Sequence, residues 1–357
     1  MDPLAALGRA LLAEGYSFIT PTPETHRRVL AHRADASGRK QIASYPNEAP
    51  AATGVAQAGT PPHRVLAHRA DASGRKQITS YPNEAPEVSD AAPGQQPPAP
   101  RARAQLLRDV FGWSLSGALP PHLDALLNAA SARAPDGRSA VRFSTLGPLL
   151  CAHSAYPTVQ PDAIFFGPDT YRFGSLLSAR VERAGHVADV GCGSGAGGLL
   201  LAPRARSVQL LDINPRAVRF AAANAELNGL QARAAVSDVL AGAEGPLDLI
   251  VANPPYLADD LGRAYRDGGA DLGTALSVRI AAESLERLAP GGRLLLYTAT
   301  PVVDGAHLIW PALQRLLGHT RYDYVELDPD VFGEELDRPA YRHVERIAVV
   351  ALDAAKL

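Results

Sequence analysis

The sequence predicts an α/β fold with a mostly parallel sheet. Three observations support it: apolar runs alternate with helical stretches, a glycine-rich turn follows the first run, and acidic residues end successive runs. Helix-like stretches separate the first five runs, notably Pro215–Leu227 and Leu276–Leu288, which predicts parallel strands with helices on both faces. No helical stretch separates the last two, so we predict an antiparallel hairpin at one sheet edge. The predicted strands are His186–Val190, Val208–Asp212, Ala232–Ser237, Leu247–Ala252, Arg293–Thr298, Tyr322–Leu327 and Arg346–Leu352.

A small helical domain is expected before this sheet. Thr22 is placed to cap a helix that starts with Pro23. We therefore predict an N-terminal helical domain over residues 1–148 and a second domain over residues 159–357. Apolar residues at helical spacing predict its helices over Pro3–Glu14, Pro23–Arg33, Arg103–Phe111 and Leu123–Arg133.

An internal duplication interrupts the helical domain. The segment Arg28–Pro50 recurs as Arg64–Pro86, with Thr79 in place of Ala43. Stacked repeats need an apolar face and usually at least three units, whereas each copy here holds few apolar residues. We predict that residues 34–100 form a mostly disordered insertion, because so polar a segment cannot offset its ordering entropy. The alternative is a basic arm that touches RNA.

Charge and cysteine content exclude some classes of protein. The net charge is −2, so bulk charge gives no argument for nucleic acid or a membrane. From Thr25 to Arg103, eleven Lys/Arg stand against six Asp/Glu; from Ala104 onward, acids outnumber bases by 28 to 23. Only Cys151 and Cys192 occur, no apolar run could span a bilayer, and the start does not resemble a signal peptide. We expect a soluble cytoplasmic protein without a metal site, and nothing predicts its oligomeric state.

The glycine-rich turn and three acids predict a nucleoside site. Glycines allow a tight turn and a close approach of a ligand to the backbone, and the spacing also fits a dinucleotide-binding turn. Asp212, twenty-one residues after Gly191, can accept hydrogen bonds from ribose hydroxyls, and Asp238 could hold an adenine amino group. With Asp189 they end successive parallel strands, so all three acids face one crevice, and together they predict an adenosine site.

The segments Val187–Leu199 and Leu211–Leu230 resemble the first two motifs of class I S-adenosylmethionine-dependent methyltransferases. This resemblance implies a seven-stranded Rossmann-like sheet with an antiparallel seventh strand, and S-adenosyl-L-methionine as the cofactor. Carried over by position, it assigns Asp189, Gly191, Gly193 and Gly195 to the methionine part, Asp212 to the ribose, and Asp238 with Val239 to the adenine.

The fourth predicted strand runs directly into Asn253-Pro254-Pro255-Tyr256. The prolines stiffen this exit, and without a ligand the tetrapeptide would be only a rigid turn. For methyl transfer, the Asn253 side-chain oxygen and the Pro254 carbonyl can accept both N–H groups of a planar nitrogen, which makes its lone pair more available. The Tyr256 ring can stack on a flat substrate. We therefore predict that Asn253, Pro254, Pro255 and Tyr256 form the catalytic motif of an N-methyltransferase.

Two kinds of substrate remain open. The chain resembles HemK-type release-factor glutamine methyltransferases in its helical domain, its tetrapeptide and the segment Phe165–Phe173, which stands where that family has Pro-x-x-Thr-Glu. This placement makes Thr170 a further cofactor-binding residue. The sequence departs from the pattern at Gly167, where Arg is usual, and at Tyr171, where Glu is usual. We predict a protein glutamine of a release factor as the acceptor, because the part from Ala104 onward is acidic; an RNA or DNA amino group is the alternative, and a non-catalytic cofactor-binding module is a third reading.

Overall fold

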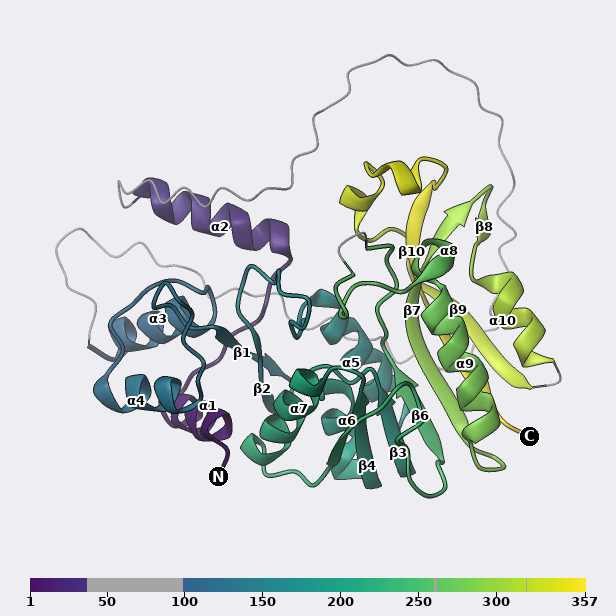
Figure 1. Ribbon diagram of the computed structural model, residues 1–357, viewed down its shortest axis with the longest axis horizontal. Coiled ribbons are helices and arrows are strands. Elements are labelled where there is room, and N and C mark those ends of the chain that lie inside the picture. The colour runs from purple at the N-terminus through teal and green to yellow at the C-terminus, as the bar shows by residue number, and fades with distance from the viewer. Residues whose placement is uncertain (37–98, 260–261, 319) are drawn as a thin grey trace, which may run out of the picture. The chain divides into compact units, whose positions relative to one another are not determined.

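The protein is described by a computed structural model that covers residues 1–36, 99–259, 262–318 and 320–357. Its centre is a sheet in the strand order β5-β4-β3-β6-β7-β10-β9, with the short β8 paired to β7 (Figure 1). The strands of this sheet are β3 (Ala184–Val190), β4 (Ala205–Asp212), β5 (Arg233–Val236), β6 (Leu249–Ala252), β7 (Arg293–Val303), β8 (Ala306–His307), β9 (Arg321–Asp328) and β10 (Arg346–Ala355).

The strand directions confirm the predicted sheet. Strands β3 to β7 run parallel to one another, and each matches a predicted run to within three residues at either end, except that β7 continues five residues further. Strand β10, the seventh of the predicted strands, lies between β7 and β9 and is antiparallel to both. The hairpin of β9 and β10 therefore closes one edge of the sheet as expected, and among the described strands of this sheet only the two-residue β8 was not predicted.

Helices cover both faces of the sheet, as the alternating pattern predicts. On one face, apolar side chains of α5, α6 and α7 pack with Val187, Val208 and Leu295 in a continuous core. On the other face, α9 and α10 pack against Ala188 and Ile250. These helices are α5 (Pro168–Arg180), α6 (Ala196–Leu201), α7 (Pro215–Leu227), α9 (Ala275–Arg287) and α10 (Trp310–Leu317), with a short turn α8 (Ala270–Gly273) before α9.

One predicted helical connection is wrong. Between β5 and β6 the chain forms turns and irregular structure instead of a helix. The connection is only twelve residues long and contains Gly242, Gly245 and Pro246, which disfavour a helix. Ser237 stabilises the first turn, since its hydroxyl accepts from the Gly242 N–H at 2.9 Å and donates to the Val239 carbonyl at 2.8 Å.

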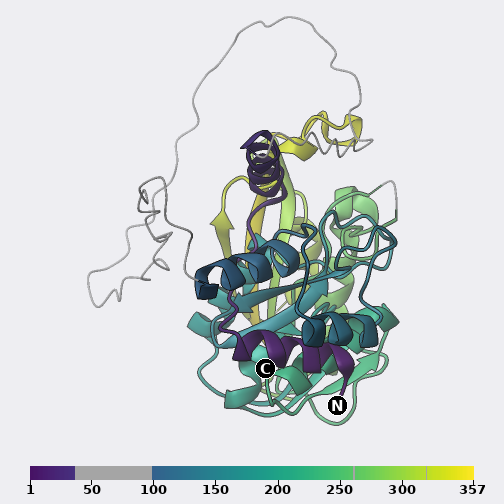
Figure 2. The same cartoon turned by 90° about the vertical axis from the view of Figure 1, so that its left-hand side faces the viewer.

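The N-terminal helices share a core with the sheet domain. Apolar residues of α1, α3 and α4 join Phe220 and Leu227 of α7 in one buried cluster, and Figure 2 shows these purple and blue helices on the near side of the molecule. A hairpin of β1 (Val141–Leu146) and β2 (Leu149–Ser154), not predicted from the sequence, belongs to the same cluster. The helices are α1 (Pro3–Ala13), α2 (Pro23–Ala36), α3 (Ala99–Phe111) and α4 (Pro121–Ala129).

The helix ends differ slightly from the predicted ones. Thr22 caps α2 as expected, since its hydroxyl accepts from the Thr25 N–H at 3.2 Å. Helix α4 ends at Ala129, four residues earlier than predicted, because Ser131 takes a left-handed backbone conformation that cannot continue a helix. Helix α2 extends to Ala36 and α3 begins at Ala99, so the ends of the predicted insertion are helical, and its remainder lies outside the described residues. No helix among the described residues is long and apolar enough to cross a membrane.

Candidate active site

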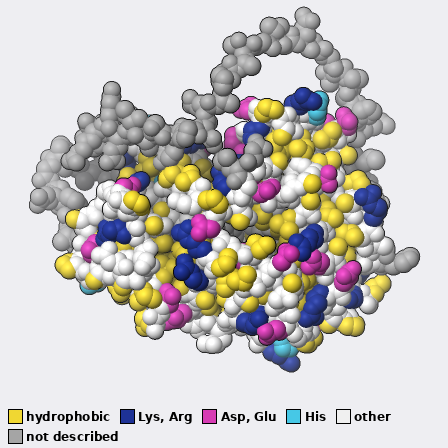
Figure 3. Space-filling model, in the orientation of Figure 1, with side chains coloured by type: hydrophobic (Ala, Val, Ile, Leu, Met, Phe, Trp, Pro, Cys, Tyr) yellow, Lys and Arg dark blue, Asp and Glu magenta, His cyan; other side chains and the backbone are white. Residues whose placement is uncertain are grey.

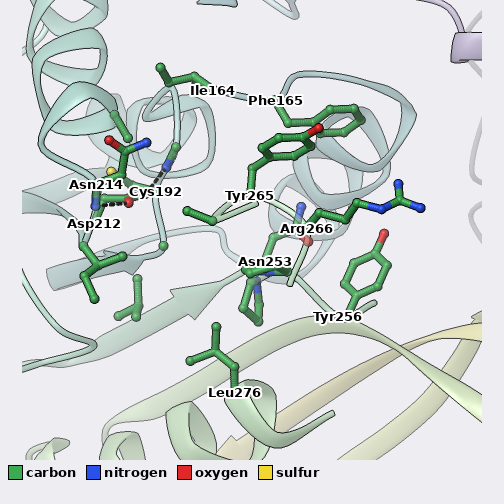
Figure 4. A pocket seen from close by; sticks show the side chains of 18 of the residues that line it. Ile164, Phe165, Cys192, Asp212, Asn214, Asn253, Tyr256, Tyr265, Arg266 and Leu276 are labelled. Atoms are coloured by element: carbon green, nitrogen blue, oxygen red, sulfur yellow. Dashed lines mark hydrogen bonds between the residues drawn. The ribbon is translucent and has the colours of Figure 1, made fainter. Parts of the chain in front are cut away.

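A cavity of about 420 Å³ lies at the carboxyl ends of β3, β4, β5 and β6. This is the edge at which parallel α/β sheets bind ligands, and the volume falls in the range of small-molecule sites. Figure 4 shows Asp212 and Cys192 on one side of Asn253, and Tyr265 and Arg266 on the other. All but one of the predicted site residues line it: Thr170, Asp189, Gly191, Gly193, Asp212, Asp238, Val239, Asn253, Pro254, Pro255 and Tyr256.

Gly195 is the predicted residue that does not line the cavity. It precedes α6 with φ = 78°, a left-handed conformation that favours glycine. A Cβ at this position would lie 3.1 Å from the Ala221 side chain and 3.2 Å from that of Leu210. Gly195 therefore lets α6 pack closely on β4 and α7, and its effect on a cofactor would be indirect.

The glycine-rich turn is held against β4 by its own backbone. The N–H groups of Gly191 and Cys192 both donate to the Leu211 carbonyl, at 2.8 and 3.0 Å. The Gly193 N–H donates to the Asp212 carboxylate at 2.8 Å. The turn thus has a fixed shape at the floor of the cavity.

Asp189 is a buried acid beneath this turn. Its side chain is 2% exposed, and one carboxylate oxygen accepts from the Gly198 N–H of α6 at 2.7 Å. Burial raises the pKa of Asp189 to about 7, although the Gly198 hydrogen bond opposes this shift. A cationic ligand in the cavity would favour the ionised carboxylate.

Asp212 closes the turn from the end of β4. One of its oxygens accepts from the Gly193 N–H and the other from the Asn214 N–H, at 2.8 and 2.9 Å. Burial raises the pKa of this carboxyl above its usual value, and both backbone bonds oppose the rise. Each oxygen keeps a second lone pair, so the side chain can still accept from the hydroxyls of a ribose.

Asp238 differs from the other two acids because an arginine holds it. It is about half exposed, and Arg279 of α9 donates to its two oxygens at 2.8 and 2.9 Å. These hydrogen bonds lower the pKa of Asp238 below its usual value. The next residue, Val239, has φ = 49°, which is rare for a β-branched side chain. Its N–H makes no hydrogen bond to another described residue, so it can donate to a ring nitrogen in the cavity.

The tetrapeptide follows directly from β6 and places Asn253 and Tyr256 in the cavity wall. Within the part of the chain that the structure describes, the Asn253 side chain has no hydrogen-bond partner and is free to accept. Tyr256 is only 7% exposed, and its hydroxyl donates to Asp169 at 2.6 Å. Burial, with a smaller effect of Asp169, raises the pKa of Tyr256 well above 10, so the hydroxyl stays protonated.

Two aromatic rings lie above Asn253 in Figure 4. The Phe165 and Tyr265 rings are nearly parallel, at 7°, with their centroids 6.0 Å apart. The Tyr265 hydroxyl donates to the Thr158 carbonyl at 2.6 Å, which ties the segment after the tetrapeptide to the loop before α5. Arg266 in the same segment is paired with Glu335, which lies between β9 and β10.

Sequence reasoning missed three features of this site: the bond between Tyr256 and Asp169, the pair of Asp238 and Arg279, and the stacked rings. Asp169 and Phe165 belong to the segment Phe165–Phe173, which resembles a family motif. Nothing in the sequence indicates their partners, which lie between 41 and 100 residues away along the chain.

Fold and site together define a class I S-adenosylmethionine-dependent methyltransferase domain: the seventh strand is antiparallel, three acids end successive strands around one cavity, and Asn-Pro-Pro-Tyr follows the fourth. Residues 170–321 match the family described as methyltransferase small domain. This part of the chain is such a domain, and its cofactor is S-adenosyl-L-methionine.

The chain is similar to curated proteins of at least two kinds. A release factor glutamine methyltransferase of Koribacter versatilis is 36% identical over 172 residues, which covers 42% of this chain and 60% of the relative. A ribosomal RNA small subunit methyltransferase C of Pseudomonas aeruginosa is 34% identical over 155 residues, 42% of each chain. Among solved structures, the 16S rRNA N2 G1207 methyltransferase of T. thermophilus, in complex with AdoMet and guanosine, matches with a TM-score of 0.41 and 21% identity, over 61% of this chain and 50% of its own. The chain spans about half the length of the first release-factor relatives.

Proposed function

We propose that the protein transfers a methyl group from S-adenosylmethionine to the side-chain amide nitrogen of a glutamine in a protein substrate, a release factor. The residues present fit the cofactor. Asp189 and Asp212 place carboxylates around a cavity of suitable size, which suits a ligand that carries a sulfonium cation and ribose hydroxyls. When bound, the cofactor supplies a methyl group that is already activated for transfer.

The chain's own contribution is to orient the acceptor nitrogen. The free Asn253 side-chain oxygen and the Pro254 carbonyl can accept the two N–H groups of a planar amide. This arrangement directs the nitrogen lone pair toward the methyl group and stabilises the positive charge that develops on nitrogen. After transfer the nitrogen gives up one proton and remains a neutral secondary amide.

The charges around the cavity favour a protein substrate over a nucleic acid. Among the described residues that line it, the only cations are Arg266 and Arg279, and each is paired with a carboxylate. On the side of the molecule that Figure 3 shows, Lys and Arg side chains of the described residues lie among Asp and Glu, without a continuous basic area. A nucleic acid that inserts a base would bring its phosphates close to this rim, where no free cation would hold them. The acids that line the cavity are Asp169, Asp189, Asp212, Asp238, Asp267 and Glu334.

A second candidate is the amino group of a nucleobase in RNA or DNA. The stacked Phe165 and Tyr265 rings favour it, since aromatic side chains stack on bases, as does the resemblance to a ribosomal RNA methyltransferase. The basic segment from Thr25 to Arg103 could supply phosphate contacts away from the cavity.

One labelling experiment separates the two. The full chain is incubated with methyl-labelled S-adenosylmethionine and, in parallel, with purified release factors, ribosomal RNA and transfer RNA. We expect label on a release factor, at a glutamine that peptide mass spectrometry identifies. Label on RNA alone would replace this proposal with the second candidate.

A further inference from the structure

Asp169 is a buried carboxylate at the start of α5 that no cofactor or substrate role accounts for. It is 5% exposed, and three side chains donate to it: Tyr256 at 2.6 Å, Tyr297 at 2.9 Å and Arg172 at 3.1 Å. Tyr297 lies on β7, Tyr256 lies in the tetrapeptide that follows β6, and Arg172 lies one turn further along α5. The carboxylate therefore joins three elements at the wall of the cavity.

The surroundings of Asp169 suit a negative charge. It occupies the first turn of α5, where backbone N–H groups and the helix dipole favour an anion. Arg172 reaches it from a position that is 41% exposed and also bonds Asp328 at 2.9 Å. Hydrogen bonds from neutral hydroxyls to an ionised carboxylate are among the stronger ones in proteins, so this cluster is well suited to fix its members in place.

Of the two tyrosines, only Tyr256 belongs to the tetrapeptide and lines the cavity. Pro254 and Pro255 restrict the backbone of the tetrapeptide, but they leave the Tyr256 side chain free to rotate about two bonds. The bond to Asp169 holds that ring at its far end. The two prolines thus restrict the backbone of the tetrapeptide, and the bond to Asp169 separately restricts the Tyr256 side chain.

We propose that Asp169 is a positioning residue for methyl transfer, which holds the Tyr256 ring by its hydroxyl so that the ring forms a rigid wall of the acceptor site beside Asn253. The inference rests on the proposed function, because the wall matters only if a planar nitrogen is held there. Misplacement of a group that orients a substrate affects the rate of the chemical step more than binding. We therefore expect loss of the Asp169 contact to lower kcat more than it raises KM.

A double-mutant cycle tests this role with the acceptor that the wild-type chain methylates. Asp169→Asn preserves shape but replaces one acceptor oxygen with a donor, and Tyr256→Phe keeps the ring but removes its hydroxyl. We expect each to lower kcat on the order of tenfold with KM changed less than about threefold, and the double variant to be no slower than either. Tyr297→Phe is the matched control, since it removes an equal hydroxyl from the same carboxylate, and it should lower kcat less than about threefold.

Two outcomes of the cycle would overturn the proposal. If the two losses in kcat multiply in the double variant, Asp169 does not act through Tyr256. If Asp169→Asn lowers the melting temperature as Tyr297→Phe does but leaves kcat unchanged, its role is structural only.

A measurement that needs no methyl transfer tests the contact between Asp169 and Tyr256 separately from the proposed function. Tyrosine rings labelled with carbon-13 are observed by NMR in the full chain, and the signal lost in Tyr256→Phe identifies Tyr256. We expect Asp169→Asn to shift and broaden that signal and Tyr297→Phe to shift it much less. An unchanged Tyr256 signal in Asp169→Asn would overturn the positioning role, whereas absence of any methylated acceptor, with the signal shifted, would refute the proposed function and leave the contact supported.

Discussion

At the scale of single residues, Asp189 links cofactor binding to pH. Burial raises its pKa from 3.8 to about 7, so the folded protein binds this proton more tightly than the unfolded chain does between those values. The contribution of Asp189 to the free energy of unfolding therefore decreases as pH rises through that window, and above it the folded state carries the full cost of a buried charge.

The same ionisation should govern affinity for S-adenosylmethionine. The cofactor carries a net positive charge, so it binds the ionised carboxylate better, and we expect its Kd to decrease as pH rises from 6 to 8. Asp189→Asn should bind more weakly and lose most of this pH dependence, while its melting temperature at pH 8 rises above that of the wild type. Calorimetry of cofactor binding and thermal unfolding at both pH values measure these effects. Identical Kd profiles for the two proteins would contradict the assignment of Asp189.

Asn253 should act on the reaction and not on the cofactor. Asn253→Ala removes the side-chain acceptor for the amide N–H, so we expect kcat to fall about 10²–10³-fold, as for other removed transition-state hydrogen bonds. Asn253→Asp keeps acceptor oxygens of the same shape and should retain more activity than the alanine variant. The Kd for S-adenosylmethionine should stay within about threefold in both, because binding the cofactor does not need this group. A parallel loss of cofactor affinity would instead mean that Asn253 belongs to the cofactor site.

The residues that could be predicted for this site are those whose signal is local. The glycine turn, Asp212 and the tetrapeptide each follow a recognisable strand, and the order of parallel strands then brings them to one edge. Gly195 shows the limit of this reasoning, since a glycine within the motif serves helix packing. No local pattern determines how α5 and α9 are placed against the sheet. The contacts of Asp169 with Tyr256 and of Asp238 with Arg279 depend on that placement and could not be predicted.

At the scale of elements, the turn that follows the tetrapeptide depends on a glycine. Gly273 has φ = 93°, and a Cβ there would lie 2.5 Å from the Leu257 backbone and 2.6 Å from that of Tyr256. Gly229, after α7, has φ = 66° with open space around it. The two positions share a positive φ, but Gly273 is buried against the tetrapeptide and Gly229 is exposed.

This pair gives a matched test of the loop. Gly229→Ala should lower the free energy of unfolding by about 1–2 kcal/mol, the cost of a left-handed alanine, without changing kcat. Gly273→Ala should cost at least about 2 kcal/mol more, because backbone atoms must move, and should lower kcat as the tetrapeptide shifts. Denaturant unfolding and the labelling assay measure both effects. Equal stability losses with kcat preserved in Gly273→Ala would show that the tetrapeptide does not depend on this turn.

Secondary structure could be predicted where the pattern is long and repeated. The buried parallel strands read as continuous apolar runs, and their ends are correct to a few residues. The helix predicted between β5 and β6 was wrong because the alternation of strands and helices was extended to a stretch that is short and contains Gly242, Gly245 and Pro246, which disfavour a helix. The hairpin of β1 and β2 was missed because both strands are short: residues 141–144 of β1 alternate for only four residues, and residues 149–152 of β2 do not alternate at all.

At the scale of the whole molecule, the N-terminal helices and the sheet domain are not independent. The Thr20 N–H donates to the Tyr171 hydroxyl of α5 at 3.0 Å, and Leu7 and Leu11 of α1 share a buried cluster with Phe220 of α7. This cluster involves only described residues on either side of the predicted insertion. The stability of the catalytic part therefore includes the N-terminal helices.

Removal of the segment between α2 and α3 tests whether the fold depends on this segment and whether the acceptor is a protein or RNA. Replacing residues 37–98 with a flexible Gly/Ser linker keeps α2, α3 and every described core residue, so we expect a melting temperature within a few degrees of the wild type. The deleted segment holds six of the eleven Lys/Arg between Thr25 and Arg103, although five Asp/Glu nearly balance them, and a protein acceptor does not need these bases. For a release factor we therefore expect KM and its dependence on salt to be unchanged. If RNA is the acceptor, lost phosphate contacts should weaken binding and flatten the slope of log Kd against log salt. A flattened slope would favour the nucleobase as acceptor, because bound phosphates are the main source of such salt dependence.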